Sequence, residues 1–197
     1  MSAVVRSLIV LAVFIAPGAA SAHPVFGGIG GFPGGLLHPL FVPAHLLAIV
    51  AVGVLIAQNA SCRRWLYAIA FSAGLLAGFA AIASAYTPAL TGETLLALAF
   101  IGGALVALAK PLPRPLIGLL TAATGIAIAL DSPPDAISLR EAALMQIGTF
   151  WGATILLFVI YECARRLTRG WQRVGVRILG SWIAASAVLV LALRLAK

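Results

Sequence analysis

Acidic side chains are scarce in this chain, whose 197 residues contain five Asp and Glu against thirteen Lys and Arg. Charged residues make up 9% of the sequence, whereas a soluble domain carries about 25%. Hydrophobic residues make up 62%, and the mean hydropathy is +1.12. The composition excludes a soluble globular domain and predicts an all-α, polytopic membrane helix bundle, because helices satisfy their own backbone groups in lipid.

The sequence lacks the residue patterns that several functional classes require. The chain has two cysteines, Cys62 and Cys163, both at helix ends expected in the reducing cytoplasm, so no disulfide is expected. No serine-nucleophile, zinc-protease or phosphate-loop motif occurs, and no enzymatic activity is predicted. The basic residues lie between apolar segments, where they act as topology signals and do not indicate nucleic-acid binding.

Residues 1–22 have the features of a secretory signal peptide. Arg6 precedes the apolar run 8–16, and the small residues Ala20, Ser21 and Ala22 offer a cleavage site. We expect cleavage after Ala22, which leaves one transmembrane domain, 23–197. An uncleaved first helix is the alternative.

The mature chain contains six apolar segments that predict six transmembrane helices after the signal peptide. They are 40–57, 65–85, 94–109, 116–130, 139–163 and 174–193. The loops after the first, third and fifth segments carry Lys and Arg, whereas the loops 86–93 and 131–138 carry none. The positive-inside rule therefore predicts a bacterial inner (cytoplasmic) membrane protein with a periplasmic N-terminus. Arg194 and Lys197 conflict with the rule, at the position where it is weakest.

Glycine is frequent in two settings. The stretch 27–35 holds too many glycines to predict a stable helix, which leaves an exposed leader or a re-entrant loop. Gly74 with Gly78, and Gly148 with Gly152, form GxxxG spacings that let helices approach closely. We expect these pairs to pack helices within one chain, and a homo-oligomer is the alternative.

Histidine occurs only three times, at His23, His38 and His45. On one continuous helix, His38 and His45 would lie about 10 Å apart along the axis, too far to share an ion. Pro43 interrupts that helix, and a broken start could bring the two imidazoles together. Imidazole suits nickel, copper or zinc. The alternative is that His38 caps a helix while His45 hydrogen-bonds a carbonyl.

Three further residues are candidate metal ligands. Asp131 ends an otherwise apolar helix, and Glu141 lies near the predicted outer start of the fifth. His23 would offer its α-amine and its imidazole after signal cleavage. The ordinary roles of such carboxylates are turns and helix N-termini.

The segment from His38 to Gly53 reads HPLFVPAHLLAIVAVG. It resembles the His-Pro-x-x-Gly-x-Asp-His-x-x-Ala-Met-x-x-Val-Gly signature of the HupE/UreJ proteins, and residues 175–185 are similar to the last helix of that family. The resemblance implies a membrane protein associated with hydrogenase or urease, and a permease for nickel or cobalt. This chain departs from the family at Val42, at Ala44 in place of the metal-site Asp, and at 121–132, where a second histidine cluster is absent.

We therefore expect a protein that binds or transports a divalent transition metal, with nickel the first candidate. The expected ligands are His38 and His45 with Asp131 or Glu141, and the expected partners are the metal ion and the lipid bilayer. The alternative is a non-transporting scaffold or accessory protein for a metalloenzyme system. Such a protein would dock a partner through the basic loop from Arg165 to Arg177.

Overall fold

The computed structural model describes residues 30–59, 64–84, 86, 89–134 and 138–196, and all regular structure within these ranges is helical. The all-α prediction is confirmed for them. The signal peptide 1–22 and His23 lie outside the described residues. The helices, in chain order, are α2 (Gly31–Phe41), α3 (Pro43–Asn59), α4 (Arg64–Ala83), α5 (Thr91–Leu108), α6 (Arg114–Leu130), α7 (Leu139–Ala164) and α8 (Gly170–Leu195).

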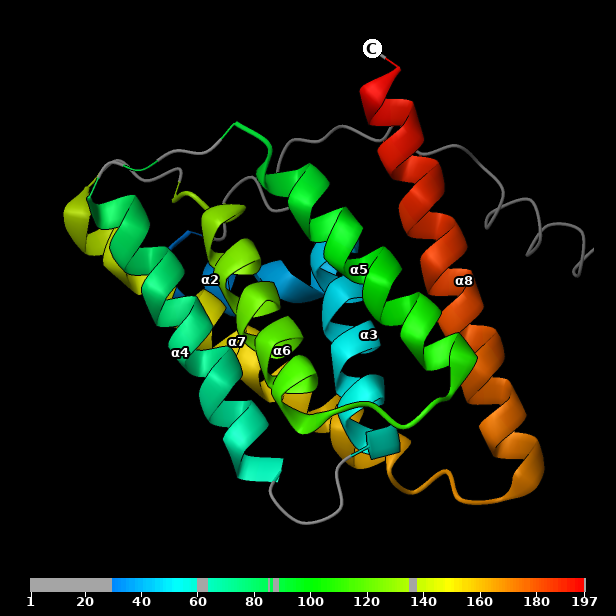
Figure 1. Cartoon of the computed structure of the whole chain (residues 1–197). Helices are drawn as coiled ribbons and strands as arrows, with labels where there is room; N and C mark the ends of the chain where they lie inside the picture. The colour runs from blue at the N-terminus through cyan, green and yellow to red at the C-terminus, as the bar shows by residue number, and fades with distance from the viewer. Residues whose placement is uncertain (1–29, 60–63, 85, 87–88, 135–137, 197) are drawn as a thin grey trace, which may run out of the picture.

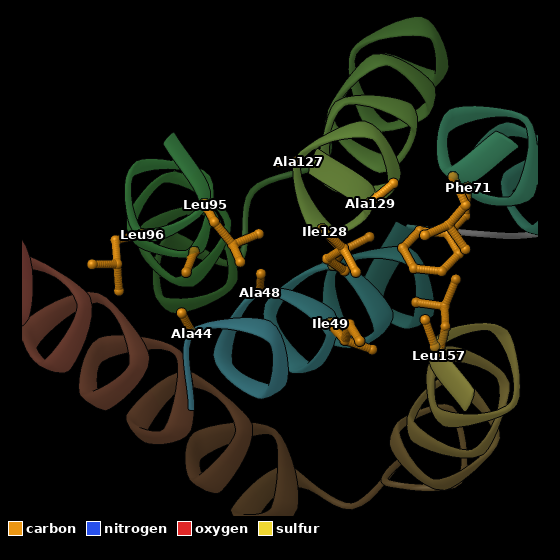
Figure 2. Packing of buried hydrophobic residues seen from close by; sticks show 14 of the residues in the cluster. Ala44, Ala48, Ile49, Phe71, Leu95, Leu96, Ala127, Ile128, Ala129 and Leu157 are labelled. Atoms are coloured by element: carbon orange, nitrogen blue, oxygen red, sulfur yellow. The ribbon is translucent and has the colours of Figure 1, made fainter. Parts of the chain in front are cut away.

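Helix α3 is the centre of the bundle, and most of its residues are buried. The other helices pack around it mainly in pairs, α4 with α6, α2 with α7, and α5 with α8 (Figure 1). Figure 2 shows Ala48 and Ile49 of α3 among Leu95 of α5, Ile128 of α6 and Leu157 of α7, all of them buried. This packing fixes the first turns of α3 relative to α5, α6 and α7.

Both GxxxG pairs pack helices within the chain, as predicted. A side chain on Gly74 would overlap the backbone of Ala122 in α6. Side chains on Gly148 and Gly152 would overlap the carbonyl oxygens of Phe32 and Leu36 in α2. These glycines let α4 approach α6 and let α7 approach α2 at backbone contact, where no other residue fits.

The prediction that the glycine-rich stretch forms no stable helix is wrong for residues 31–35, which begin α2. Glycine costs about 1 kcal/mol relative to alanine inside a helix. Here Gly35 is buried against the backbone of Met145 and Thr149 in α7. The packing of two backbones overrides the local propensity, because tertiary contacts supply most helical stability in proteins.

Helices α2 and α3 form a broken pair. Val42 between them is extended, with φ −87° and ψ 110°, and its N–H donates to the carbonyl oxygen of His38. The residue before a proline avoids the helical region, and Pro43 has no N–H to continue the helical ladder. The two helices meet at a 68° bend, which makes them either one broken span or a re-entrant loop.

Four helices, α4, α5, α7 and α8, are long and apolar enough to cross a membrane, and the broken pair α2–α3 makes a possible fifth. Large apolar side chains such as Leu76, Phe158 and Trp182 are exposed on their outer faces. An apolar exterior of this kind fits lipid rather than water. Helix α6 is apolar but, with 17 residues, is shorter than these four helices and is not counted among the candidate spans. Its segment is thus helical as predicted, while the number of spans found is four or five.

Polar side chains that join different helices lie at the two ends of the bundle. The starts of α3 and α5 and the ends of α6 and α8 share one end, where His45, Asp131 and Arg194 lie. The ends of α3 and α5 and the start of α8 share the other, since Gln58 donates to the carbonyl of Val106 and Arg177 to that of Ala107. The basic α5–α6 and α7–α8 loops therefore lie at the end opposite the histidines.

Candidate metal centre

The break at Pro43 brings the two histidines together. His38 lies near the end of α2 and His45 in the first turn of α3. Their ring centroids are 5.0 Å apart, and the rings meet edge to face at 73°. On a continuous helix the spacing would be about 10 Å along the axis. The bend thus produces the arrangement that the sequence offered as one of two possibilities.

His45 is fully buried and has two different environments at its two ring nitrogens. Nε2 lies 3.0 Å from Oδ2 of Asp131. Nδ1 is buried, and no polar group of the described residues hydrogen-bonds to it. When Nε2 carries the proton that it donates to the carboxylate, Nδ1 keeps its lone pair. A buried lone pair of this kind can accept a hydrogen bond or coordinate a cation.

Asp131 is held by groups from two other helices. Its backbone N–H closes the end of α6 by bonding to the carbonyl of Ala127. Its Oδ1 accepts a hydrogen bond of 2.8 Å from the hydroxyl of Thr91, at the start of α5. Its Oδ2 is bonded to His45 of α3. Both carboxylate oxygens are therefore fixed in position, which orients the imidazole they contact.

A positive charge lies beside this carboxylate. Arg194, near the end of α8, lies 3.9 Å from Oε1 of Glu93. Gly92 between Thr91 and Glu93 is buried, and a side chain there would overlap the guanidinium of Arg194 and lie 3.4 Å from Oδ1 of Asp131. The absence of a side chain at Gly92 lets Arg194 approach both acids, so the positive charge of this arginine lies near the carboxylate of Asp131.

Glu141 is placed away from the histidines. It lies in the first turn of α7, where its N–H donates to the hydroxyl of Ser138. Its carboxylate lies beside Gly30 at the start of α2. From Gly30 to His38 the helix advances about 12 Å. The structure therefore brings together His38, His45 and Asp131, and leaves Glu141 at the far end of α2.

A complete metal cage is not present in the part of the chain that the structure describes. No group of three or more His, Cys, Asp or Glu there could hold an ion as it stands. His23 and Cys62 lie outside the described residues, and Cys163 is an exposed free thiol. The centre is therefore a pair of imidazoles with one carboxylate behind the second ring.

Sequence reasoning missed Thr91 and Arg194. Thr91 opens an apolar helix together with Gly92 and Glu93, a pattern that indicates a helix start and nothing more specific. Arg194 stood out in the sequence as a basic residue on the predicted outer side, against the positive-inside rule. Its contacts with Glu93 and its place beside Asp131 give that exception a structural reason.

A family model described as HupE / UreJ protein matches residues 11–190, which is nearly the whole chain. No curated protein and no solved structure shows a match.

Proposed function

This chain belongs to the HupE/UreJ family, and we propose that it is an inner-membrane permease that binds a divalent transition metal and passes it across the membrane. The family consists of membrane accessory and transport proteins that are associated with nickel and cobalt. Nickel is our first candidate because imidazole is a good ligand for it. We place the histidine end of the bundle in the periplasm, as the basic loops at the opposite end indicate.

The proposal also takes α6 as a sixth span. Its 17 residues rise about 26 Å, close to the hydrocarbon thickness of about 30 Å. Asp131 then lies at the periplasmic surface of the inner membrane, where water and ions reach it.

The observation that carries the proposal is the asymmetry of His45. Its Nε2 bonds to Asp131 at 3.0 Å, while its buried Nδ1 has no hydrogen-bond partner among the described residues. Histidines that ligate metals characteristically donate their other N–H to a carboxylate, which fixes the tautomer and makes the ligand more basic. Nδ1 of His45 and the ring of His38, at 5.0 Å between centroids, are then the two imidazole ligands.

Asp131 compensates for the residue that the family motif leads us to expect at Ala44. The side chain of Ala44 cannot contribute an oxygen, but Asp131 reaches His45 from α6. A carboxylate behind the imidazole also supplies negative charge that stabilises a bound cation. We assign Asp131 to orienting His45 and His38 with His45 to direct ligation.

Two protein ligands suit a site that an ion must leave again. Resident metals are held by three or four protein ligands, and the described residues offer no such set. Conduction requires a site that attracts the ion and still releases it. Water molecules complete the coordination in our proposal, and the ion enters from the polar end of the bundle.

Uptake of radioactive nickel by cells that express the chain tests the proposal. We expect accumulation with the wild type and its loss with His38→Ala combined with His45→Ala. Glu141→Gln, which removes a carboxylate at the same end of the bundle but away from the imidazoles, is the matched control. Equal accumulation in all three strains, at equal protein levels, contradicts transport through this site.

One observation favours a second candidate function, a non-transporting scaffold for a metalloenzyme system. The described residues hold no ligand set of three, whereas the segment from Arg165 to Arg177 exposes five arginines for a partner. The prediction that this whole segment is a loop is wrong, because α8 begins at Gly170. The scaffold is supported if the purified protein binds no nickel and a co-purifying partner is lost when the charges of this segment are reversed. Nickel binding that depends on His45 supports the permease.

A further inference from the structure

A large cavity lies at the end of the bundle opposite the histidines. Its volume is about 610 Å³, and its walls come from the ends of α3 and α7, the α5–α6 loop, the α7–α8 loop and the start of α8. Five basic residues line it, namely Lys110, Arg114, Arg165, Arg173 and Arg177. This cavity is separate from the candidate metal centre and has no role in the proposed transport.

The positive charge of the cavity is largely uncompensated. Glu162 binds Arg165 through an ion pair of 2.5 Å, and this hydrogen bond raises the pKa of the guanidinium above its usual value. Within the described ranges, Lys110, Arg114 and Arg173 form no ion pair with a carboxylate. Clustered cations of this kind repel one another, so the arrangement is stabilised when an anion lies among them.

The walls of the cavity are fixed by hydrogen bonds. Asn59 at the end of α3 accepts from the N–H of Leu112, and Gln58 donates to the carbonyl of Val106. Arg177 donates its Nε–H to the carbonyl of Ala107, which anchors this side chain at the end of α5. A cavity with anchored walls requires little reorganisation when a ligand binds. The starts of α6 and α8 also lie here, and their positive dipole ends add to the attraction for an anion.

The surroundings of the cavity belong to a membrane boundary. Trp171 in the first turn of α8 is 71% exposed, and Leu167 of the preceding loop is also exposed. Tryptophan is enriched at membrane–water interfaces. Basic pockets between transmembrane helices on the cytoplasmic side bind the headgroups of anionic lipids.

We propose that this basic cavity binds the phosphate headgroup of an anionic phospholipid. Lys110, Arg114 and Arg173 would contact the phosphate oxygens, while the acyl chains would follow the exposed apolar faces beside α8. Bidentate arginine contacts to phosphate account for the excess of Arg over Lys in the cavity.

Thermal unfolding of the full chain in nanodiscs tests this proposal. The discs contain phosphatidylcholine alone or phosphatidylcholine with phosphatidylglycerol. The cavity variant carries Arg114→Gln and Arg173→Gln. The control variant carries Arg166→Gln and Arg169→Gln, which remove the same charge from the same end of the bundle without altering the cavity lining. Native mass spectrometry of the same samples counts retained phosphatidylglycerol.

We expect phosphatidylglycerol to raise the unfolding temperature of the wild type and the control variant, and to remain bound to both. The cavity variant should lose the shift and retain at least fivefold less lipid. Equal losses in the two variants would mean a general surface-charge effect and overturn the cavity assignment. If inorganic phosphate in phosphatidylcholine discs reproduces the whole shift while phosphatidylglycerol gives none, the ligand is a soluble anion and the lipid assignment is wrong.

Discussion

Asp131 accepts a hydrogen bond from the buried ring of His45 across 86 positions of the sequence. The bond joins the end of α6 to the start of α3, and the hydroxyl of Thr91 adds α5 to the same carboxylate. Asp131 therefore has two effects that experiments can separate. It ties three helix ends together, and it sets the tautomer of the imidazole that we assign to the metal.

Asp131→Asn should weaken nickel binding by about 10- to 100-fold, the effect typical of outer partners of metal-bound histidines. The amide keeps the size of the side chain but loses the negative charge. Titration calorimetry of the purified protein measures the change. Glu141→Gln should leave the affinity within about twofold, since that carboxylate lies beside Gly30, away from the rings. Equal effects of both substitutions would indicate a general electrostatic contribution and argue against a specific one.

Thr91→Val should lower the free energy of unfolding by about 1 kcal/mol, because it removes the hydroxyl that donates to Oδ1 of Asp131 at similar side-chain volume. Thr94→Val on the same helix is the matched control. Its hydroxyl is exposed and bonds only to the carbonyl of Leu90. Denaturant titration in detergent should show a loss for Thr91→Val only. A loss of equal size in both variants would assign the effect to helix α5 itself.

Arg194→Gln should strengthen nickel binding severalfold at low ionic strength. The guanidinium lies beside Asp131 and Glu93 and repels an incoming divalent cation. The gain should shrink at 1 M salt, where the screening length falls to about 3 Å. Dissociation constants at low and high salt provide the measurement. Weaker binding in the variant would mean that Arg194 holds the acids in place more than it repels the ion.

Gly148→Ala should destabilise the fold by about 1–3 kcal/mol, as expected for overpacking. The added methyl group would overlap the carbonyl of Phe32 and force α2 away from α7. Gly118→Ala in α6 is the control, because nothing lies within 4 Å of the added carbon, and alanine there should be neutral or slightly stabilising. Gly148→Ala should also lose nickel affinity, since α2 carries His38. Unchanged stability would contradict the packing described for α2.

The apolar segments of the sequence predict α3 to α8 to within a few residues, because long apolar runs between basic loops have few alternatives in lipid. Pro43 also indicates the break that brings His38 and His45 together. Helix α2 could not be predicted, since its stability depends on backbone contacts of Gly35 with α7, which are not local in sequence.

The carboxylates show the same limit. Both Asp131 and Glu141 belong to the predicted outer end. The apolar helix that Asp131 ends makes it the better candidate in the sequence, but nothing local shows which carboxylate meets a histidine. Only the packing of α6 beside α3 brings Asp131 to His45, while α7 takes Glu141 to the start of α2. The position of Arg194 is likewise explained only by the packing of the end of α8 beside the start of α5.

X-ray absorption spectroscopy of the purified, nickel-loaded protein tests the assignment of the metal to the two imidazoles most directly. We expect scattering from two imidazole rings around nickel in the wild type, and a reduced imidazole contribution in His45→Ala. A spectrum with oxygen ligands alone, or one that His45→Ala leaves unchanged, would contradict it.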